Sequence, residues 1–205
     1  MTGEGVAWLI SAVAFAFSMT ATPGPNNTML TASGATFGFM PTVPHMLGIS
    51  FGFPAMLLAM ALGAGEVLRA APWLYGVLRW AGAAYLLWLA WRIATARPQD
   101  DQGQATGRPL SFLQAALFQW VNPKAWVIVL GAAVTYTTGR GAAPWVQAVV
   151  LAVIFVLVTL PVTAFWTAVG VGVARVLRTA RARRLFNIAL AGLLVASLVP
   201  VLVGD

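Results

Sequence analysis

The sequence predicts an all-α polytopic membrane protein, and its composition, charge spacing and helix breaks each support that fold class. The chain has 205 residues, of which 60% are hydrophobic and only 8% are charged. Between Gly5 and Gly65 there is no Asp, Glu, Lys or Arg. One membrane-spanning helix needs roughly 20 apolar residues, so this stretch holds more than one span. No soluble domain of this size needs so much apolar sequence.

Apolar runs separated by short polar turns predict six transmembrane helices. They cover residues 5–21 with a continuation over 26–37, then 42–63, 72–91, 111–135, 143–169 and 186–203. The hydrophilic segment 97–110 is a predicted cytoplasmic linker between two three-helix repeats, 1–96 and 111–205. Because each half has an odd number of spans, the second half is inverted relative to the first, which is a common plan for secondary transporters.

Two pairs of prolines agree with that repeat. Pro23 and Pro123 are 100 positions apart, and so are Pro44 and Pro144. With 12 prolines in the chain, some matches of this kind arise by chance. The pairs therefore add only a little to the prediction of an inverted repeat with broken helices 1 and 4.

The distribution of arginine predicts the orientation. Loops 1–2, 3–4 and 5–6 contain Arg92, Arg97, Arg108 and the five arginines of 175–184, whereas the other side contains Arg69 and Arg140. Basic residues concentrate in cytoplasmic loops, so these three loops are predicted to be cytoplasmic and both termini periplasmic. The basic segment 175–186 is expected to lie along the membrane surface.

Composition also narrows the function. The chain has no Cys, one His and a net charge of +7. Its arginines lie between apolar runs, where they set topology or contact anionic lipid rather than nucleic acid. No His, Asp and Glu cluster has metal-ligand spacing, and no glycine-rich loop could hold phosphates. We therefore expect membrane lipid as a partner, no nucleic acid, no metal and no cofactor.

The two helix breaks are the predicted substrate site. A broken helix within a bilayer leaves backbone groups that need partners, so it is tolerated mainly where it lines a cavity or packs in protein. Asn122-Pro123 has the pattern of an N-cap followed by a first-turn proline, and Thr22-Pro23 and Gly24-Pro25 permit the same. Each break then presents the positive end of a helix dipole, which attracts a carboxylate.

The candidate substrate-binding residues are those at the breaks, with Lys124 adding a full positive charge and the amides adding neutral hydrogen bonds. They are Pro23, Gly24, Pro25, Asn26, Asn27, Gln119, Asn122, Pro123 and Lys124. The alternative interpretation is a pair of packing kinks, with Lys124 extending toward lipid headgroups. Polar residues within membrane helices are usually functional, which favours the site.

His45 is the candidate proton-coupling group. It is the only histidine, it lies near the start of the second span, and a free imidazole titrates near neutral pH. The alternative is a neutral histidine that hydrogen-bonds a loop carbonyl near the interface.

Several motifs of the sequence resemble those of a known family. The motifs that carry the resemblance are Thr22-Pro23-Gly24-Pro25-Asn26, Ser33-Gly34 with Gly38, Leu47-Gly48-Ile49 with Gly52, the segment from Trp80 to Arg92, and the segment from Phe118 to Trp126. They are similar to those of the LysE/RhtB family of amino-acid exporters. The resemblance implies export of amino acids or related zwitterions across the bacterial inner membrane, driven by the proton gradient, with both breaks in the transport pathway.

One departure from the family pattern bears on the substrate. Many members carry an acidic residue directly after the glycine that corresponds to Gly52, and this chain has Phe53. That argues against a basic substrate such as lysine and against an acidic coupling group in the second span. His45 and Glu66 are the residues left to replace it.

Two other classes of function are alternatives to a transporter. A non-transporting membrane scaffold or accessory subunit predicts that the breaks tolerate Pro→Ala changes and that no wet cavity joins them. An intramembrane enzyme is disfavoured, because the sequence has no nucleophile–base pair and no metal set. A homodimer is possible, because six short spans make a small wall around a pathway.

Overall fold

The computed structural model describes residues 3–96, 108–136, 143–177 and 179–199, and every regular element in these ranges is a helix. In chain order they are α1 (Gly3–Ala21), α2 (Pro25–Phe37), α3 (Phe39–Ala59), a π-helical turn (Met60–Ala64), α4 (Gly65–Ala70), α5 (Pro72–Ala94), α6 (Phe112–Phe118), a 3-10 turn (Gln119–Val121), α7 (Pro123–Tyr136), α8 (Pro144–Val176) and α9 (Ala180–Ala196). The predicted all-α class is confirmed.

Prolines and a capping serine determine several helix starts. Pro25, Pro72 and Pro144 occupy the first turns of α2, α5 and α8, where a missing N–H costs nothing because that group has no partner within the helix. Ser111 begins α6 with a capping box, in which its hydroxyl accepts from Gln114 N and its own N–H donates to the Gln114 side chain. The helix thus satisfies its own first donors.

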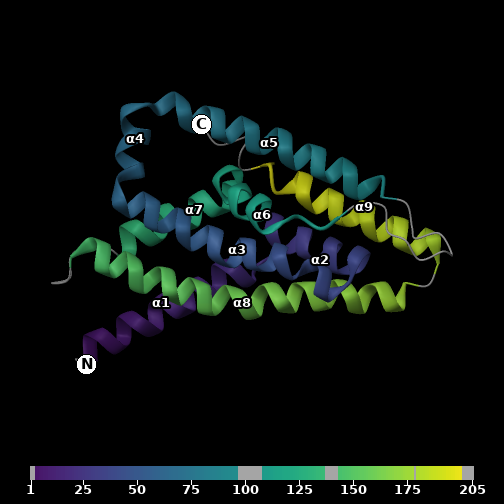
Figure 1. Cartoon of the computed structure of the whole chain (residues 1–205), viewed down its shortest axis with the longest axis horizontal. Helices are drawn as coiled ribbons and strands as arrows, with labels where there is room; N and C mark the ends of the chain where they lie inside the picture. Colours follow the sequence, from purple (N-terminus) through teal and green to yellow (C-terminus); the bar gives the residue numbers. More distant parts are fainter. Residues whose placement is uncertain (1–2, 97–107, 137–142, 178, 200–205) are drawn as a thin grey trace.

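Two glycines turn the chain where other residues would be strained. Gly38, with φ 85°, is the single residue between α2 and α3, and Gly63, with φ 117°, lies within the π-helical turn. Only glycine adopts such angles without steric cost. Gly38 therefore lets α3 follow α2 directly, and Gly63 redirects the chain into α4, the upright helix that joins α3 to α5 (Figure 1).

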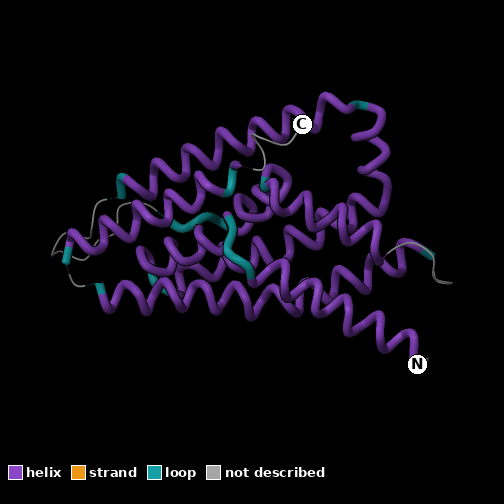
Figure 2. Tube along the Cα trace, turned by 180° about the vertical axis from the view of Figure 1, so that it is seen from behind, coloured by secondary structure: helices purple, strands orange, loops and turns teal. Residues whose placement is uncertain are grey.

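Helices from the two halves of the chain pack against each other. The long helix α8, from the second half, runs the length of the molecule and packs against α1, α2 and α3 (Figure 1). In return, α6 of the second half packs on α3 of the first, and α5 packs along α9. Seen from behind, the described chain is drawn almost entirely as helix, with loops between the helices (Figure 2). Each broken helix thus lies against an unbroken helix of the other half.

Small residues allow these close crossings. A Cβ built on Gly34 of α2 would clash with the carbonyl oxygen of Thr167 in α8, and one on Gly170 would clash with the carbonyl oxygen of Thr31 in α2. Gly52 of α3 has the same relation to Ala116 of α6. Glycine at such contacts lets helix backbones approach closely in membrane proteins. The crossings next to the breaks are therefore fixed by backbone-to-backbone packing.

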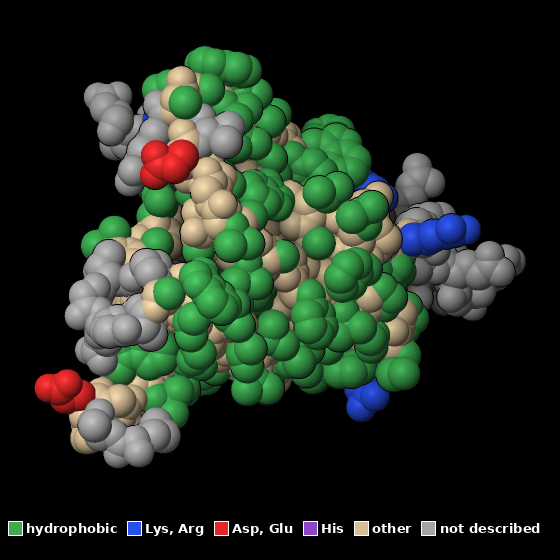
Figure 3. Space-filling view, turned by 60° about the vertical axis from the view of Figure 1, so that its left-hand side comes forward, with side chains coloured by type: hydrophobic (Ala, Val, Ile, Leu, Met, Phe, Trp, Pro, Cys, Tyr) green, Lys and Arg blue, Asp and Glu red, His purple; other side chains and the backbone are tan. Residues whose placement is uncertain are grey.

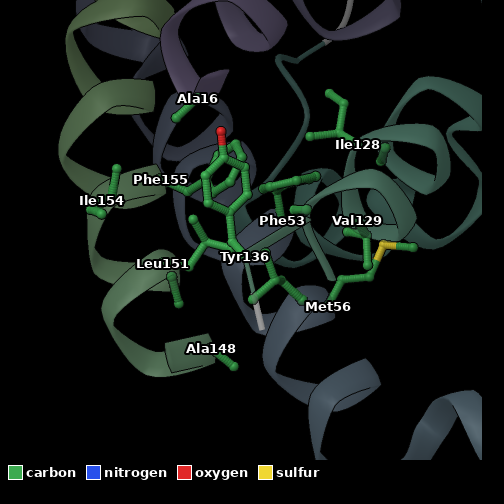
Figure 4. Packing of buried hydrophobic residues seen from close by; sticks show 14 of the residues in the cluster. Ala16, Phe53, Met56, Ile128, Val129, Tyr136, Ala148, Leu151, Ile154 and Phe155 are labelled. Carbon is green, nitrogen blue, oxygen red and sulfur yellow. The ribbon is translucent and has the colours of Figure 1, made fainter. Parts of the chain in front are cut away.

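A hydrophobic cluster, which includes several aromatic rings, packs α1, α3, α7 and α8 together (Figure 4). The rings of Phe53 and Phe155 lie 4.8 Å apart between centroids. Tyr136 packs at 5.4 Å from Phe15 and donates its hydroxyl to the Ser11 carbonyl at 3.1 Å. Phe53 is thus a buried core side chain.

The surface and the helix lengths fit a membrane protein. Three of the described helices are long and apolar enough to cross a membrane: Gly3–Ala21, Phe39–Ala64 and Trp145–Val176. The pair Phe112–Val121 and Pro123–Tyr136, bent by 71°, would count as a fourth. Hydrophobic side chains dominate the face shown in Figure 3, and charged atoms lie at its margins. Six spans in an inverted repeat, and the division at 97–110, stay predictions.

The end of the fifth predicted span differs from expectation. Helix α8 continues to Val176 rather than ending near 169, which places Arg175 in its last turn. In the basic segment 175–186, Arg175 thus belongs to α8 and residues 180–186 begin α9, while the place of the segment along a membrane surface stays a prediction. The hydroxyl of Thr179 caps α9 by accepting from Ala182 N at 3.1 Å. A cap of this kind starts a new helix, and the amphipathic pattern alone did not reveal it.

Candidate functional site

The two helix breaks meet. Lys124, in the first turn of α7, donates from Nζ to the Thr22 carbonyl and the Thr22 hydroxyl, both at 2.8 Å, and to the Pro23 carbonyl at 3.3 Å. These are the three hydrogen bonds that an ammonium can donate. The carbonyls belong to the end of α1, where the helix dipole is negative. Lys124 therefore compensates the end of a helix from the other half of the chain.

Further side chains satisfy the rest of the α1 terminus. Asn27, from α2, folds back and donates to the carbonyls of Thr20 and Thr22, both at 2.8 Å. Trp166, from α8, donates from its indole to the Ala21 carbonyl at 3.3 Å. A helix end within apolar surroundings needs such partners because each unpaired carbonyl is costly. The first break is thus held both by Asn27 of its own segment and by side chains from α7 and α8.

The start of α2 has no side-chain cap. Gly24 is the N-cap residue, Pro25 follows at the first position, and Thr28 N donates to the Gly24 carbonyl at 2.9 Å. A Cβ on Gly24 would lie 2.8 Å from Cδ of Lys124. A side chain at this position would therefore collide with the lysine stem. Gly24 thus leaves space for the Lys124 side chain, which reaches the carbonyls of Thr22 and Pro23.

The second break is built locally. After the 3-10 turn the chain is extended at Asn122, with φ −84° and ψ 112°, and Pro123 begins α7. The Asn122 side-chain oxygen accepts from Lys124 N at 3.1 Å, and its carbonyl accepts from Ala125 N at 3.0 Å. This is the predicted N-cap followed by proline.

An amide pair joins the breaks a second time. Asn26 donates to Gln119 Oε1 at 2.9 Å, and Gln119 donates back to Asn26 Oδ1 at 3.2 Å and to the Ala115 carbonyl at 2.9 Å. Gln119 is fully buried. Since the two amides satisfy each other, neither is open to a substrate in this conformation.

A small cavity lies between the breaks, and its lining is mostly apolar with several polar side chains. Its volume is about 30 Å³, and its lining includes Asn26, Asn122, Lys124 and, from α8, Thr159. A cavity needs roughly 10–15 Å³ to hold one water, so this space has room for a water or two but not for an amino acid. The Thr159 hydroxyl is buried without a hydrogen-bond partner among the described residues. Sequence reasoning missed Thr159, which lies inside a long apolar run.

His45 lies apart from the breaks, on a much larger cavity that we call the vestibule. The vestibule has a volume of about 770 Å³ and lies between the ends of α2, α5, α8 and α9. His45 is only 2% exposed, and neither ring nitrogen has a hydrogen-bond partner in the described part of the chain. The predicted site residues therefore divide into a closed cluster at the breaks and a single histidine on the vestibule wall.

The geometry of the site contains no metal centre within the described residues, since no group of three or more His, Asp or Glu side chains could hold an ion there. The polar groups at the breaks are amides, hydroxyls, carbonyls and one ammonium. Such groups bind by hydrogen bonding and charge, without the nucleophile and base that covalent chemistry needs.

Comparison with known proteins places this arrangement in a family. Residues 17–202 match the LysE type translocator family. The chain belongs to that family. The resemblance stated from the break motifs is thus confirmed, and together with the apolar helices it identifies a multi-pass membrane protein.

Curated relatives cover a smaller part of the chain. The "Cysteine/O-acetylserine efflux protein" of Escherichia coli (strain K12) is 42% identical over 106 residues, which are 50% of this chain and 52% of the relative. The protein of the same name from Shigella flexneri serotype 5b (strain 8401) matches equally. The chain thus spans about half the length of the curated relatives it matches. No solved structure matches it.

Proposed function

We propose that this protein exports small zwitterionic amino acids across the bacterial inner membrane as a secondary transporter. The observation that carries the proposal is the meeting of two broken helices, from the two halves of the chain, at Lys124. Broken helices whose ends meet near the middle of the membrane are a recurring substrate site in secondary transporters. The relatives are named for efflux of cysteine and O-acetylserine, which supports a small neutral amino acid as the substrate.

The proposed transport cycle is alternating access between two inverted repeats, 1–96 and 111–205. The reciprocal packing of α2 on α8 and of α6 on α3 supports the repeat. In the orientation that the arginines predict, the vestibule opens toward the cytoplasm, because its walls end at loops 1–2, 3–4 and 5–6. The closed cluster at the breaks then separates the vestibule from the periplasm, as in an inward-facing state.

Opening of the breaks would create the substrate site. Helices α2 and α7 both begin there, so their positive ends can receive a carboxylate. Lys124 and the Asn26–Gln119 amides would exchange their present partners for the substrate. Exchange of partners keeps buried polar groups satisfied throughout the cycle.

Proton antiport is the proposed driving reaction, with His45 as its coupling group. The observation behind it is a buried imidazole without a described partner on the vestibule wall. Replacement of His45 by Asn should abolish the stimulation of efflux by a pH gradient while substrate exchange at equal pH continues. Gradient-stimulated efflux at the wild-type rate in this variant excludes His45 as the proton carrier.

Efflux measurements test the proposed function directly. Cells or inverted vesicles loaded with labelled amino acids should show efflux that depends on the protein. Lys124→Ala should reduce efflux by at least tenfold, because a charged hydrogen-bonding group contributes about 1.5–3 kcal/mol, and Asn122→Ala should reduce it less. Unchanged efflux of all tested amino acids in both variants removes the proposed site and leaves the scaffold alternative.

A further inference from the structure

The vestibule carries an unusual concentration of arginine. Four of its lining residues are arginines from four different places in the chain: Arg92 in the last turn of α5, Arg108 before α6, Arg175 in the last turn of α8 and Arg183 in the first turn of α9. Among the residues that the structure describes, no Asp or Glu lines the cavity. The vestibule is therefore strongly positive.

Two of the four arginines are held in place by neighbours. The guanidinium of Arg92 lies 5.1 Å from the centroid of the Trp88 ring. Arg183 donates from Nε to the Leu177 carbonyl at 2.9 Å, which leaves its terminal nitrogens for other partners. Fixed guanidinium groups suit carboxylate recognition because less side-chain freedom is lost on binding.

The orientation rule for basic residues does not by itself explain this arrangement. That rule accounts for arginine at the cytoplasmic ends of helices, but it does not require them to converge on one hollow. Arg181 and Arg184 belong to the same turns of α9, are exposed, and do not line the vestibule. Arginines that line the vestibule and arginines that do not line it thus lie within a few residues of each other in the sequence.

The inner wall adds a second, independent feature. His45 contributes to the lining, is buried to 98% of its surface, and has both ring nitrogens unpaired among the described residues. Buried polar atoms are nearly always hydrogen-bonded, so a buried imidazole with both nitrogens unpaired is an unusual feature of this wall. The nearby Ser33 hydroxyl is already paired with the Thr42 hydroxyl at 3.0 Å.

From these features we infer that the vestibule is an entry binding site for carboxylate-bearing solutes and that its arginines select against amino acids with a net positive charge. The inference rests on the proposed function for its place in a transport pathway. A cleft lined by one sign of charge between low-dielectric walls concentrates ions of the opposite sign by about 10- to 1,000-fold. The α-carboxylate of a neutral amino acid can bind there, and a side-chain ammonium is repelled.

Three probes of similar size separate charge from shape. They are homoserine, which is neutral overall, 2,4-diaminobutyrate, which is cationic, and aspartate, which is anionic. Binding of each to the purified full chain in detergent is measured by isothermal titration calorimetry at two salt concentrations. We expect the wild type to bind aspartate and homoserine at least tenfold more tightly than 2,4-diaminobutyrate, with less discrimination at high salt.

Two double variants remove the same charge from different places. R108Q/R175Q removes two vestibule arginines for which the structure shows no hydrogen bond to a described residue, and it should reduce the discrimination to less than threefold. R181Q/R184Q removes two arginines outside the vestibule and should retain the wild-type discrimination. Thermal melting and gel filtration check the folding of each variant, and R108Q alone replaces the first pair if that pair is unstable.

Several outcomes overturn the inference. They are wild-type protein that binds none of the probes, equal binding of all three, or discrimination that survives R108Q/R175Q or falls equally in both double variants. Failure of the proposed function appears differently, as absence of amino-acid efflux from cells while the purified protein still prefers aspartate to 2,4-diaminobutyrate. Conversely, efflux without charge discrimination leaves the exporter intact and removes only the vestibule site.

Discussion

The two helix breaks solve the same problem by different means. At the second break, the 3-10 turn leads into Asn122, whose own side chain caps α7. At the first break, the carbonyls at the end of α1 are satisfied by side chains from three other helices, and α2 begins without a side-chain cap. The second break is therefore capped by its local sequence, whereas the first depends in addition on side chains from the other half of the chain.

Because of this difference, we expect the two breaks to behave differently in a conformational change. A locally capped break keeps its shape when its surroundings move, since its hydrogen bonds move with it. A break held by long-range contacts must rearrange when those contacts separate. We therefore expect the first break to open and the second to act as a fixed support during transport. Substitutions that remove single contacts test this difference between the two breaks.

The largest effect is expected at Lys124. Lys124→Met removes three hydrogen bonds to the first break and should loosen it, which raises the population of open forms about 10- to 100-fold for a loss of about 1.5–3 kcal/mol. The chain has no native Cys, so Ala21→Cys can report opening at the first break and Val121→Cys at the second by their rates of maleimide labelling. Labelling should accelerate only at Ala21→Cys.

A matched substitution controls for the new methionine. Val127→Met changes an exposed position on the same helix, α7, and should leave both labelling rates unchanged. Equal acceleration at Ala21→Cys and Val121→Cys in the Lys124→Met background contradicts the assignment, because it means that the second break also depends on the lysine contacts.

A second, smaller effect concerns the support of the second break. A Cβ on Gly82 of α5 would clash with the carbonyl oxygen of Val121, in the 3-10 turn. Gly82→Ala should therefore destabilise the protein by about 2 kcal/mol, as overpacking typically does, and lower the thermal midpoint in detergent.

The same helix provides the control for Gly82. Gly76 has open space around a built Cβ, so Gly76→Ala should be neutral or slightly stabilising, because alanine is the better helix former. A melting temperature for Gly82→Ala that equals that of Gly76→Ala shows that the second break can shift away from α5, and the description of a fixed support then fails.

The sequence predicted what depends on local chemistry and missed what depends on distant packing. The breaks and the cap at Asn122 follow from residue types whose backbone preferences are strong, and both lie where expected. The continuation of α8 to Val176 and the cap at Thr179 were missed. An apolar run with a basic end fits a longer helix and a surface helix equally well, and only packing decides between them.

The role of Lys124 shows the same limit within the site. Its sequence position beside a helix N-terminus suggested a cation free to bind an anion, whereas the structure has it donating to the carbonyls of Thr22 and Pro23. A single sequence does not reveal that the lysine will donate a hydrogen bond to a carbonyl 102 positions away. The vestibule was missed for the same reason, since its four arginines come together only in the folded chain.

The smallest expected effect is the sharpest test of the local character of the second break. Asn122→Ala removes the cap of α7 and should cost about 1 kcal/mol, the usual value for an N-cap. Asn122→Ser keeps an acceptor for Lys124 N and should restore most of that loss. Thermal midpoints of the two variants and the wild type measure both effects. Because Asn122 is 99% buried, a loss beyond about 3 kcal/mol that Ser does not restore would mean that packing rather than capping holds this break. In that case both breaks depend on their neighbours, and either of them could open during transport.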